Sequence, residues 1–188
     1  MKTSLGAKTL LYPTPVLLIG TYDDGGRPNI MTCAWGGICC SEPPCMAVSL
    51  REATYSYGSL VRSGAFTISL PSAAQVKEAD YVGMQSGRNT DKFAELGLTA
   101  TKAEKVDAPY VEECPVVIEC RLTHTIPLGL HTLFVGEVMD VKADETVLNS
   151  RGCVDVDKMR PFAFDPGNGE YIGLEGVLGK AFSIGDQR

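Results

Sequence analysis

The sequence lacks an excess of positive charge. Its 188 residues include 17 Lys and Arg against 23 Asp and Glu, which gives a formal net charge of −6. The cations are scattered along the chain, whereas proteins that bind nucleic acid gather them into a stripe that neutralises phosphates. We therefore expect no nucleic-acid partner, and an anionic ligand would have to be held by a few local cations.

Long apolar runs are also missing. A membrane-spanning helix needs about 20 consecutive apolar residues, and no run in the sequence approaches that length. The apolar stretch near the start is interrupted by Tyr12, Pro13 and Pro15, and no small-residue cleavage site follows it. We expect no membrane partner, a start that belongs to the mature protein, and a cytoplasmic location.

Two common nucleotide-binding motifs are absent. A Rossmann site needs G-x-G-x-x-G between a strand and a helix, and a P-loop needs G-x-x-x-x-G-K-[ST]; neither occurs. Gly179-Lys180 looks like the end of a P-loop, but Leu174 occupies the position of the first glycine and Ala181 follows the lysine. A bound phosphate would need cations and free backbone N–H groups brought together by the fold.

The seven cysteines contain no C-x-x-C pair. Cys33, Cys39, Cys40 and Cys45 have a spacing that matches no usual zinc or iron–sulfur pattern. Because these four residues lie in or beside apolar sequence, we expect buried free thiols in a reducing cytosol and no metal site. A thiol-based metal protein is the third functional hypothesis, behind the two given below.

Alternation and turn residues predict a series of short strands. Residues 15–21 are apolar, and the Asp and Gly residues at 23–26 suit a tight turn, so we expect a β-hairpin whose second strand covers residues 29–37. Residues 116–124 alternate cleanly between apolar and polar side chains, and residues 131–142 supply an antiparallel partner. Further strands are expected over residues 45–51 and 66–70.

Helices are expected to be few and short. Residues 53–62 and 72–81 each suit a short helix, and Gly97 would end one further helical turn. From residue 144 onward the pattern indicates loops and short strands. About six strands with short peripheral helices favour a mainly β, antiparallel barrel over a doubly wound parallel sheet. We expect a single domain over residues 1–188.

Two polar segments could hold an anion. Residues 49–56 contain Ser, Thr and Arg where a strand ends and a helix begins, and residues 86–88 run into Lys92 at another helix start. Helix starts offer free backbone N–H groups, but Ser and Thr at these positions also serve simply as caps. Trp35, the only tryptophan, is followed by two glycines, which either admit a planar ligand or form a bulge beside a core residue.

As a set, these residues are recognisable. Residues 4–60, followed by AFTISLPS, KEADYVG, SGRNTDKF and GLHTLFVGEV, resemble the flavin reductase-like family, and within it the flavoredoxin group. The resemblance runs from Leu5 to about Phe182. It implies a split β-barrel that binds FMN noncovalently, with one FMN per subunit near the interface of a homodimer.

The resemblance also implies roles for individual residues. Two cations, Arg51 and Lys92, would neutralise the FMN phosphate. Hydroxyl or amide donors to the phosphate would come from Ser49, Thr54, Ser56, Ser86 and Gly87. The edge of the isoalloxazine ring would lie along Asn29 and the backbone of Thr32, Cys33, Ala34 and Trp35. Apolar flavin surface would be covered by Trp35, Phe164 and Tyr171.

The two histidines are expected to differ. The resemblance places His131 near the flavin, reaching across the dimer, and makes it the candidate catalytic residue, because an imidazole can hydrogen-bond the cofactor or stabilise its reduced, anionic form. Strand alternation puts His124 on the same face as Ile118, Cys120 and Leu122. We therefore expect His124 to be a core residue.

The resemblance implies an FMN-dependent oxidoreductase that receives electrons from NAD(P)H or from a redox partner protein. No residue pattern marks a nicotinamide pocket. The alternative is a non-enzymatic FMN-binding electron carrier that is fed by a partner protein and does not turn over NAD(P)H. The sequence offers no convincing Ser-His-Asp or Cys-His set, in keeping with chemistry carried by a flavin.

Overall fold

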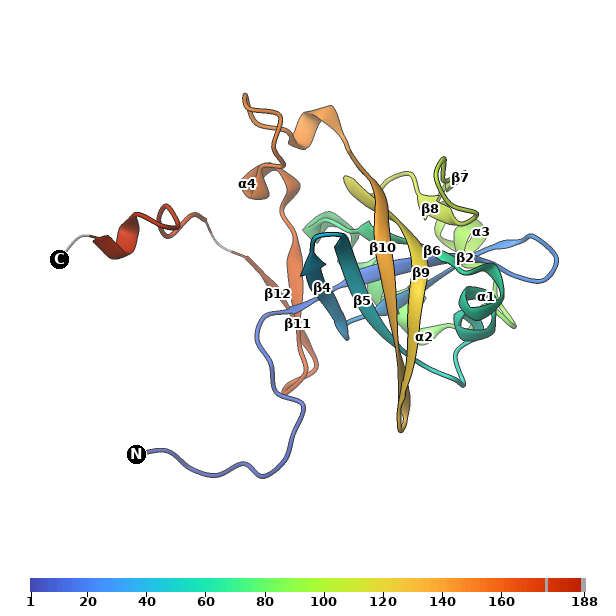
Figure 1. Ribbon diagram of the computed structural model, residues 1–188, viewed down its shortest axis with the longest axis horizontal. Coiled ribbons are helices and arrows are strands. Elements are labelled where there is room, and N and C mark those ends of the chain that lie inside the picture. Colours follow the sequence, from blue (N-terminus) through green and yellow to red (C-terminus); the bar gives the residue numbers. More distant parts are fainter. Residues whose placement is uncertain (175, 187–188) are drawn as a thin grey trace.

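The computed structural model describes residues 1–174 and 176–186. Its centre is a seven-stranded sheet in the order β3-β2-β6-β9-β10-β5-β4, in which every neighbouring pair is antiparallel (Figure 1). The strands of this sheet are β2 (Leu17–Tyr22), β3 (Pro28–Cys33), β4 (Gly36–Ser41), β5 (Pro44–Arg51), β6 (Ala65–Leu70), β9 (Val116–Leu128) and β10 (His131–Ala143). The mainly β, antiparallel architecture predicted from the sequence is confirmed.

Two small sheets accompany the large one. Their strands are β1 (Thr14–Pro15), β11 (Phe162–Asp165) and β12 (Glu170–Gly173) in one, and β7 (Ala100–Lys102) and β8 (Pro109–Val111) in the other. The sequence predicted about six strands and left most of these short ones as loops. They are short enough to show almost no alternation, so their pairing depends on the rest of the fold.

The helices are short and peripheral. They are α1 (Tyr55–Ser63), α2 (Val76–Met84), α3 (Lys92–Leu96) and α4 (Val156–Met159), with 3₁₀ turns η1 (Ala73–Gln75), η2 (Glu145–Val147) and η3 (Ile184–Asp186). The predicted stop at Gly97 is confirmed, because this glycine adopts a left-handed φ of 64° that other residues rarely adopt. Within the described residues, no helix is both long and apolar enough to cross a membrane.

The first hairpin forms as predicted. Asp23 at the turn between β2 and β3 accepts hydrogen bonds from the backbone N–H groups of Gly25 and Arg27, each at 2.9 Å. An Asp side chain that bonds to the backbone two residues on is a common way to fix a turn. The strands then pair from Tyr22 opposite Pro28 to Leu17 opposite Cys33.

The predicted strand over residues 29–37 is wrong in its extent. It breaks at Ala34 and Trp35, and the chain passes from β3 at one edge of the large sheet to β4 at the other. Within the described part of the chain, β3 and β4 do not pair with each other, so the barrel is split along this line. The apolar sequence runs on through the break, which is why the pattern alone did not reveal it.

The expectation that His124 belongs to the core is also wrong. The register between β9 and β10 shifts between Val135 and Gly136, so that one extra residue, Thr123, is inserted and the alternation is displaced. Beyond this point the β9–β10 hairpin projects from the barrel (Figure 1), and His124 is exposed, with its ring Nδ1 3.1 Å from Thr123 Oγ1.

Most of the core lies in two clusters, one on each face of the large sheet, and a third, smaller cluster is formed by Val116, Val147 and Met159. Alternate residues of β2 divide between the first two clusters: Leu17 and Ile19 join Phe66 and Phe134 inside the barrel. On the other face, residues of β2 and β3 pack beneath α2 and α3; this group includes Val16, Leu18, Ile30, Val82 and Phe93. The second cluster matters for function because it anchors the helices that line the site.

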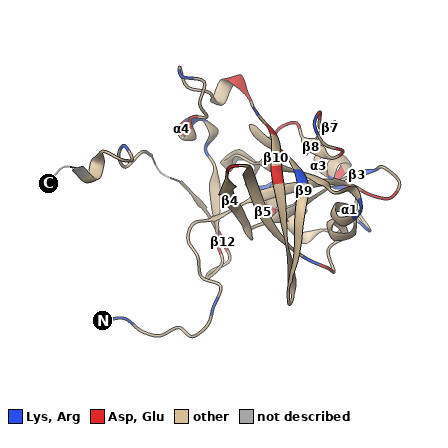
Figure 2. Cartoon of the chain, viewed as in Figure 1, with Lys and Arg blue, Asp and Glu red and all other residues tan. Residues whose placement is uncertain are grey.

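The expectation of buried thiols holds for only some of the cysteines. Cys33, Cys45, Cys114 and Cys120 are buried and free, whereas Cys39, Cys40 and Cys153 are exposed and free. In the part of the chain that the structure describes, Lys and Arg are interspersed with Asp and Glu (Figure 2).

Gly136 provides a test of the barrel interior. A Cβ atom at this position would lie 2.6 Å from Phe66 Cζ and 2.9 Å from Cys120 Cβ, whereas a Cβ at Gly37 would meet nothing within 4 Å. Overpacking of this kind costs about 1–3 kcal/mol, so Gly136→Ala should lower the free energy of unfolding in urea by that amount. Gly37→Ala is the matched control, and equal stability of the two variants would contradict this packing.

Candidate functional site

A groove lies beside the break between β3 and β4. It consists of two cavities of about 260 and 300 Å³ that share Met31, Thr32, Thr54 and Gly83 in their linings. We call the first the polar chamber and the second the edge chamber. Because the two chambers share these walls, one elongated ligand could occupy both.

The polar chamber is built over β3 by the start of α1, the loop after α2 and the start of α3. Its predicted site residues are Asn29, Thr32, Thr54, Ser56, Ser86, Gly87 and Lys92. Thr54 and Ser56 begin α1, Ser86 and Gly87 follow α2, and Lys92 begins α3. Chain starts of this kind bring hydroxyl groups and free backbone N–H groups to one place.

Lys92 is the unusual group of this chamber. Its side chain is buried, and its ammonium donates hydrogen bonds to the carbonyl oxygens of Ile30 at 2.8 Å and Val82 at 2.9 Å. No carboxylate of the described residues lies within 4.0 Å of it. Burial accordingly lowers the pKa of Lys92 to about 8. A buried cation without an anion costs several kcal/mol, so this chamber favours a bound anion.

Close packing gives Gly87 a specific role. A Cβ at residue 87 would lie 2.6 Å from Tyr55 Cδ1 and 2.9 Å from Asn29 Cγ, so only glycine fits without a shift. The Asn29 side chain in turn donates to Ser56 Oγ at 2.8 Å, and both residues are buried. The loop after α2 therefore lies directly against β3 and α1, with its backbone facing the chamber.

A network that the sequence did not reveal ties the two loops of the chamber together. Arg27 donates to the carbonyl oxygen of Gly87 at 3.0 Å and to Tyr55 Oη at 3.3 Å, and it forms an ion pair with Asp23 at 3.0 Å. Tyr55 also donates to Asp23 at 2.9 Å. Desolvation opposes ionisation of Asp23, but hydrogen bonds from Arg27, Tyr55 and Gly25 prevail and lower its pKa to about 2. We call Asp23, Arg27 and Tyr55 the clasp.

Arg88 makes a further contact with Tyr55 at the same junction. Its guanidinium donates to the carbonyl oxygen of Ala53 at 3.0 Å and lies 5.7 Å from the centroid of the Tyr55 ring. Arg88 was within a segment that the sequence singled out, whereas Arg27 appeared only as a turn residue. Because Arg27 and Gly87 are 60 residues apart, no local pattern could have paired them.

The edge chamber follows the break in the barrel. Its predicted site residues are Thr32, Cys33, Ala34, Trp35, Ser49, Arg51, Thr54 and His131. The backbone at the break is fixed by a hydrogen bond from Ser49 N to the Trp35 carbonyl oxygen at 2.8 Å. Trp35 itself is partly exposed, so it is not the core residue that the sequence left as an alternative.

Two groups in the edge chamber have distinct chemical characters. His131 and Arg51 are opposite residues of β10 and β5, so both lie at the same end of the chamber. Cys33 is buried, and desolvation raises the pKa of its thiol to about 11. At neutral pH Cys33 is therefore a neutral, unreactive wall residue.

Two features of the predicted site differ from the expectation. Arg51 and Lys92 do not converge, because Arg51 lines the edge chamber and Lys92 the polar chamber. Phe164 does not line the groove of its own chain. Its ring packs against Tyr171, with centroids 5.8 Å apart, in the core beneath α2 and α3. Tyr171, also predicted to cover the flavin, lines neither chamber. The remaining predicted site residues each line at least one.

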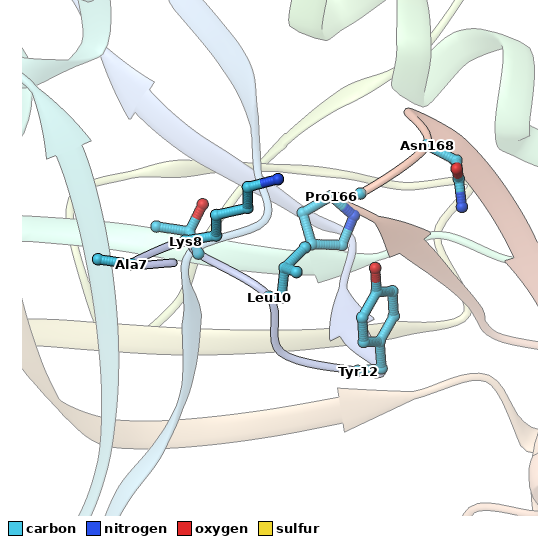
Figure 3. A pocket seen from close by; sticks show the side chains of 8 residues that line it. Ala7, Lys8, Leu10, Tyr12, Pro166 and Asn168 are labelled. Carbon is cyan, nitrogen blue, oxygen red and sulfur yellow. The ribbon is translucent and has the colours of Figure 1, made fainter. Parts of the chain in front are cut away.

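A larger cavity of about 750 Å³ lies elsewhere, between residues 7–12 and the turn after β11 (Figure 3). Its lining includes Lys8, Tyr12, Gly167 and Asn168. The turn that carries Gly167 and Asn168 is fixed by hydrogen bonds from both backbone N–H groups, and from the Asn168 side chain, to the Asp165 carboxylate. None of the predicted site residues lines this cavity. Among residues 1–174 and 176–186, no group of three or more His, Cys, Asp or Glu side chains could hold a metal ion.

Comparison with known proteins agrees with this architecture. The chain matches the family described as "Flavin reductase like domain" over residues 9–162, and it belongs to that family. The seven-stranded sheet with unpaired edges is thus the split barrel that the sequence resemblance implied.

Individual relatives are similar over most of the chain. The flavoredoxin of Desulfovibrio vulgaris (Miyazaki F) is 57% identical, with a TM-score of 0.94 and coverage of 98% of this chain and 100% of that chain. An FMN-binding domain of a flavin reductases-like enzyme from Shewanella baltica OS155 is 26% identical, with a TM-score of 0.76 and coverage of 89% of each chain. The uncharacterised protein YddH of Escherichia coli K12 is 34% identical over 158 residues, which are 81% of this chain and 83% of YddH.

If the clasp holds the loop after α2, loss of Arg27 should make that loop more mobile. Arg27→Met removes the hydrogen bonds to Gly87 and Tyr55, and because such bonds contribute about 1 kcal/mol each, amide exchange of residues 86–88 should become about fivefold faster or more. Hydrogen–deuterium exchange measures this directly. Arg62→Met, which removes an exposed ion pair with Asp24 and a hydrogen bond of 3.4 Å to the Tyr22 carbonyl oxygen, neither of which involves residues 86–88, is the control. Unchanged exchange at residues 86–88 in Arg27→Met would contradict the clasp.

Proposed function

We propose that the groove binds FMN with its phosphate in the polar chamber. The observation that carries the proposal is the buried ammonium of Lys92, which has two carbonyl partners and no carboxylate within 4.0 Å among the described residues. The hydroxyls of Ser56 and Ser86 line the same chamber and suit the oxygens of a phosphate, whereas the Thr54 hydroxyl donates to the Arg51 carbonyl oxygen at 2.8 Å. Membership of the flavin reductase-like family, and the FMN-binding Shewanella relative, support FMN as the ligand.

The flat ring of FMN would then lie in the edge chamber. The backbone of residues 33–35 is held at the split in the barrel, where its polar groups can bond to the ring edge, and the partly exposed Trp35 side chain offers apolar contact. Arg51 and His131, at the far end, would bond to the ring side of the cofactor and favour the anionic charge that a reduced flavin carries. FMN, when bound, supplies the hydride and electron transfer, and the protein supplies position and electrostatics.

We infer an FMN-dependent oxidoreductase that takes electrons from NAD(P)H or from a redox partner protein. The family match supports the reductase activity. A non-enzymatic electron carrier is the second candidate, and the 57% identity to a flavoredoxin favours a protein of that electron-transfer type. Both candidates use the same groove, and they differ in whether NAD(P)H is turned over.

A homodimer would complete the groove. Residues 1–13 are exposed and trail away from the barrel (Figure 1), and they carry the apolar side chains of Leu5, Leu10 and Leu11. Leu178, near the other end, is also exposed. Apolar segments of this kind call for a partner surface, and a second copy would bring further apolar side chains to cover the ring beside Trp35. Sedimentation of the purified protein should give the mass of two chains.

The test of the proposed function is the visible absorption spectrum after FMN is added and the protein is desalted. Retained flavin bands at one FMN per chain would support the binding site, and loss of all flavin on desalting would overturn a tightly bound cofactor. Steady-state oxidation of NADH or NADPH then separates the two candidates. Turnover supports the reductase, whereas no turnover together with rapid reduction by a ferredoxin-type protein supports the carrier.

Because the pKa of Lys92 is lowered, we expect FMN affinity to depend on pH. Since the pKa of Lys92 is lowered to about 8 in the ligand-free protein, phosphate binding above that pH must restore a proton to the amine. The FMN dissociation constant should therefore rise by up to about tenfold per pH unit above pH 8. Riboflavin, which has no phosphate, should show no such rise. In the ligand-free protein the same pKa shift makes folding stability change with pH in the opposite direction to FMN affinity. Between about pH 8 and pH 10 the unfolded chain binds the extra proton, so the free energy of unfolding increases with pH over this range.

The variant Lys92→Met checks this assignment. It should weaken FMN binding by about tenfold to hundredfold, the loss expected for a charge-assisted hydrogen bond, and abolish the pH dependence. Its riboflavin affinity should fall much less than its FMN affinity, although Ile30 and Val82 lose a hydrogen-bond donor, and retained riboflavin binding also shows that the variant is folded. Equal losses for FMN and riboflavin would mean that Lys92 supports the fold and does not meet the phosphate.

A further inference from the structure

Two cysteines face each other at the far end of the β4–β5 hairpin, away from the groove. Cys40 is opposite Cys45 in the register, and Ser41 is opposite Pro44 next to the two-residue turn. In an antiparallel hairpin the pair that follows the turn-closing pair is of the close, non-hydrogen-bonded kind, with Cα atoms about 4.5 Å apart. That separation falls within the range of about 4.4–6.8 Å that disulfides require.

The two thiols also point to the same place. Cys40 Sγ is 3.4 Å from the carbonyl oxygen of Glu42, and Cys45 Sγ is 3.4 Å from the carbonyl oxygen of Pro43, so both sulfurs lean over the turn. The Cys40 thiol is one of the groups that raise the pKa of the Cys45 thiol, as expected for close neighbours. Opposite residues of two paired strands project on the same face of a sheet, so a bond between them needs only side-chain rotation.

We propose that Cys40 and Cys45 form a thiol–disulfide exchange site that small disulfides oxidise reversibly. The thiolate of Cys40 attacks one sulfur of the small disulfide, which gives a mixed disulfide and releases one thiol. Cys45, as its thiolate, then attacks the Cys40 sulfur, which forms the Cys40–Cys45 bond and releases the second thiol. Two electrons and two protons pass from the protein to the small disulfide, which becomes two thiols.

The difference in exposure between the two thiols indicates which of them reacts first. Cys40 is exposed and lies on β4, an edge strand of the large sheet, so an incoming disulfide can reach it. Cys45 is buried, and desolvation raises the pKa of its thiol. It therefore reacts second, with the mixed disulfide that has formed on the neighbouring Cys40. The site is independent of the groove and holds whether or not FMN is the ligand.

Other thiols are poorer partners. Cys39 is the extra residue at the register shift between Ile38 and Cys40, and it has no residue opposite it. Cys120 is fully buried inside the barrel, where a small disulfide cannot reach it. Cys153 is exposed but lies in the segment between η2 and α4, outside the hairpin, and it serves as a reference thiol.

The test treats the reduced, full-length protein with glutathione disulfide without air, blocks the remaining thiols with an alkylating reagent, and measures the tryptic peptide of residues 9–51 by mass spectrometry. We expect this peptide to lack two hydrogens and to keep two of its cysteines unalkylated. Dithiothreitol should reverse the change. The variant Cys39→Ser should form the bond as the wild type does, and Cys40→Ser and Cys45→Ala should not form it.

Three results would overturn the proposal. One is a stable glutathione adduct on Cys40 that never proceeds to the internal bond. The second is a bond that survives in Cys40→Ser. The third is a disulfide between two chains, seen as a band of twice the mass on a non-reducing gel. The thermal unfolding midpoint of reduced Cys40→Ser should match that of the wild type, since Cys40 is exposed, so loss of the bond is not a loss of fold.

Discussion

The ammonium of Lys92 connects the fold to the site. It holds the carbonyl oxygens of Ile30 in β3 and Val82 in α2, while its own backbone begins α3. These three elements are the floor and walls of the polar chamber, and their apolar sides pack together as one part of the core. The same burial that lets one lysine organise three elements leaves its charge without an anion. The charge that the chamber offers to an anion therefore comes from Lys92 together with Arg88, which also lines it.

The split in the barrel provides the second half of the groove. Because the chain leaves β3 at Cys33 and enters β4 at Gly36, the two edge strands of the large sheet are joined by two residues and yet do not pair within the described chain. Backbone groups that would be used in a closed ladder are then free to face a ligand. The clasp at the other end keeps the loop after α2 against α1. The groove is thus an open seam of the sheet, closed at one end by the clasp.

Local sequence predicted the features that depend on local chemistry. The turn at residues 23–26, the stop at Gly97 and the long strands β9 and β10 are all set by nearby residues, and each formed close to its expected place. The break at Ala34 and the exposure of His124 depend on how distant strands pair, so periodicity missed both. Most site residues came from the family resemblance. The hydrogen-bond partners of Lys92 and the bond from Arg27 to Gly87 could not be predicted from the sequence, because they join residues that are 62, 10 and 60 positions apart.

The central claim is that the two chambers hold one FMN, with its phosphate beside Lys92 and its ring beside the break in the barrel. A crystal structure of the protein with FMN tests this most directly. The account predicts the phosphorus atom in the polar chamber, with phosphate oxygens bonded to the hydroxyls of Ser56 and Ser86 and facing Lys92, and the ring beside residues 33–35. A phosphate bound at Arg51 in the edge chamber, or a flavin bound outside the groove, would contradict it.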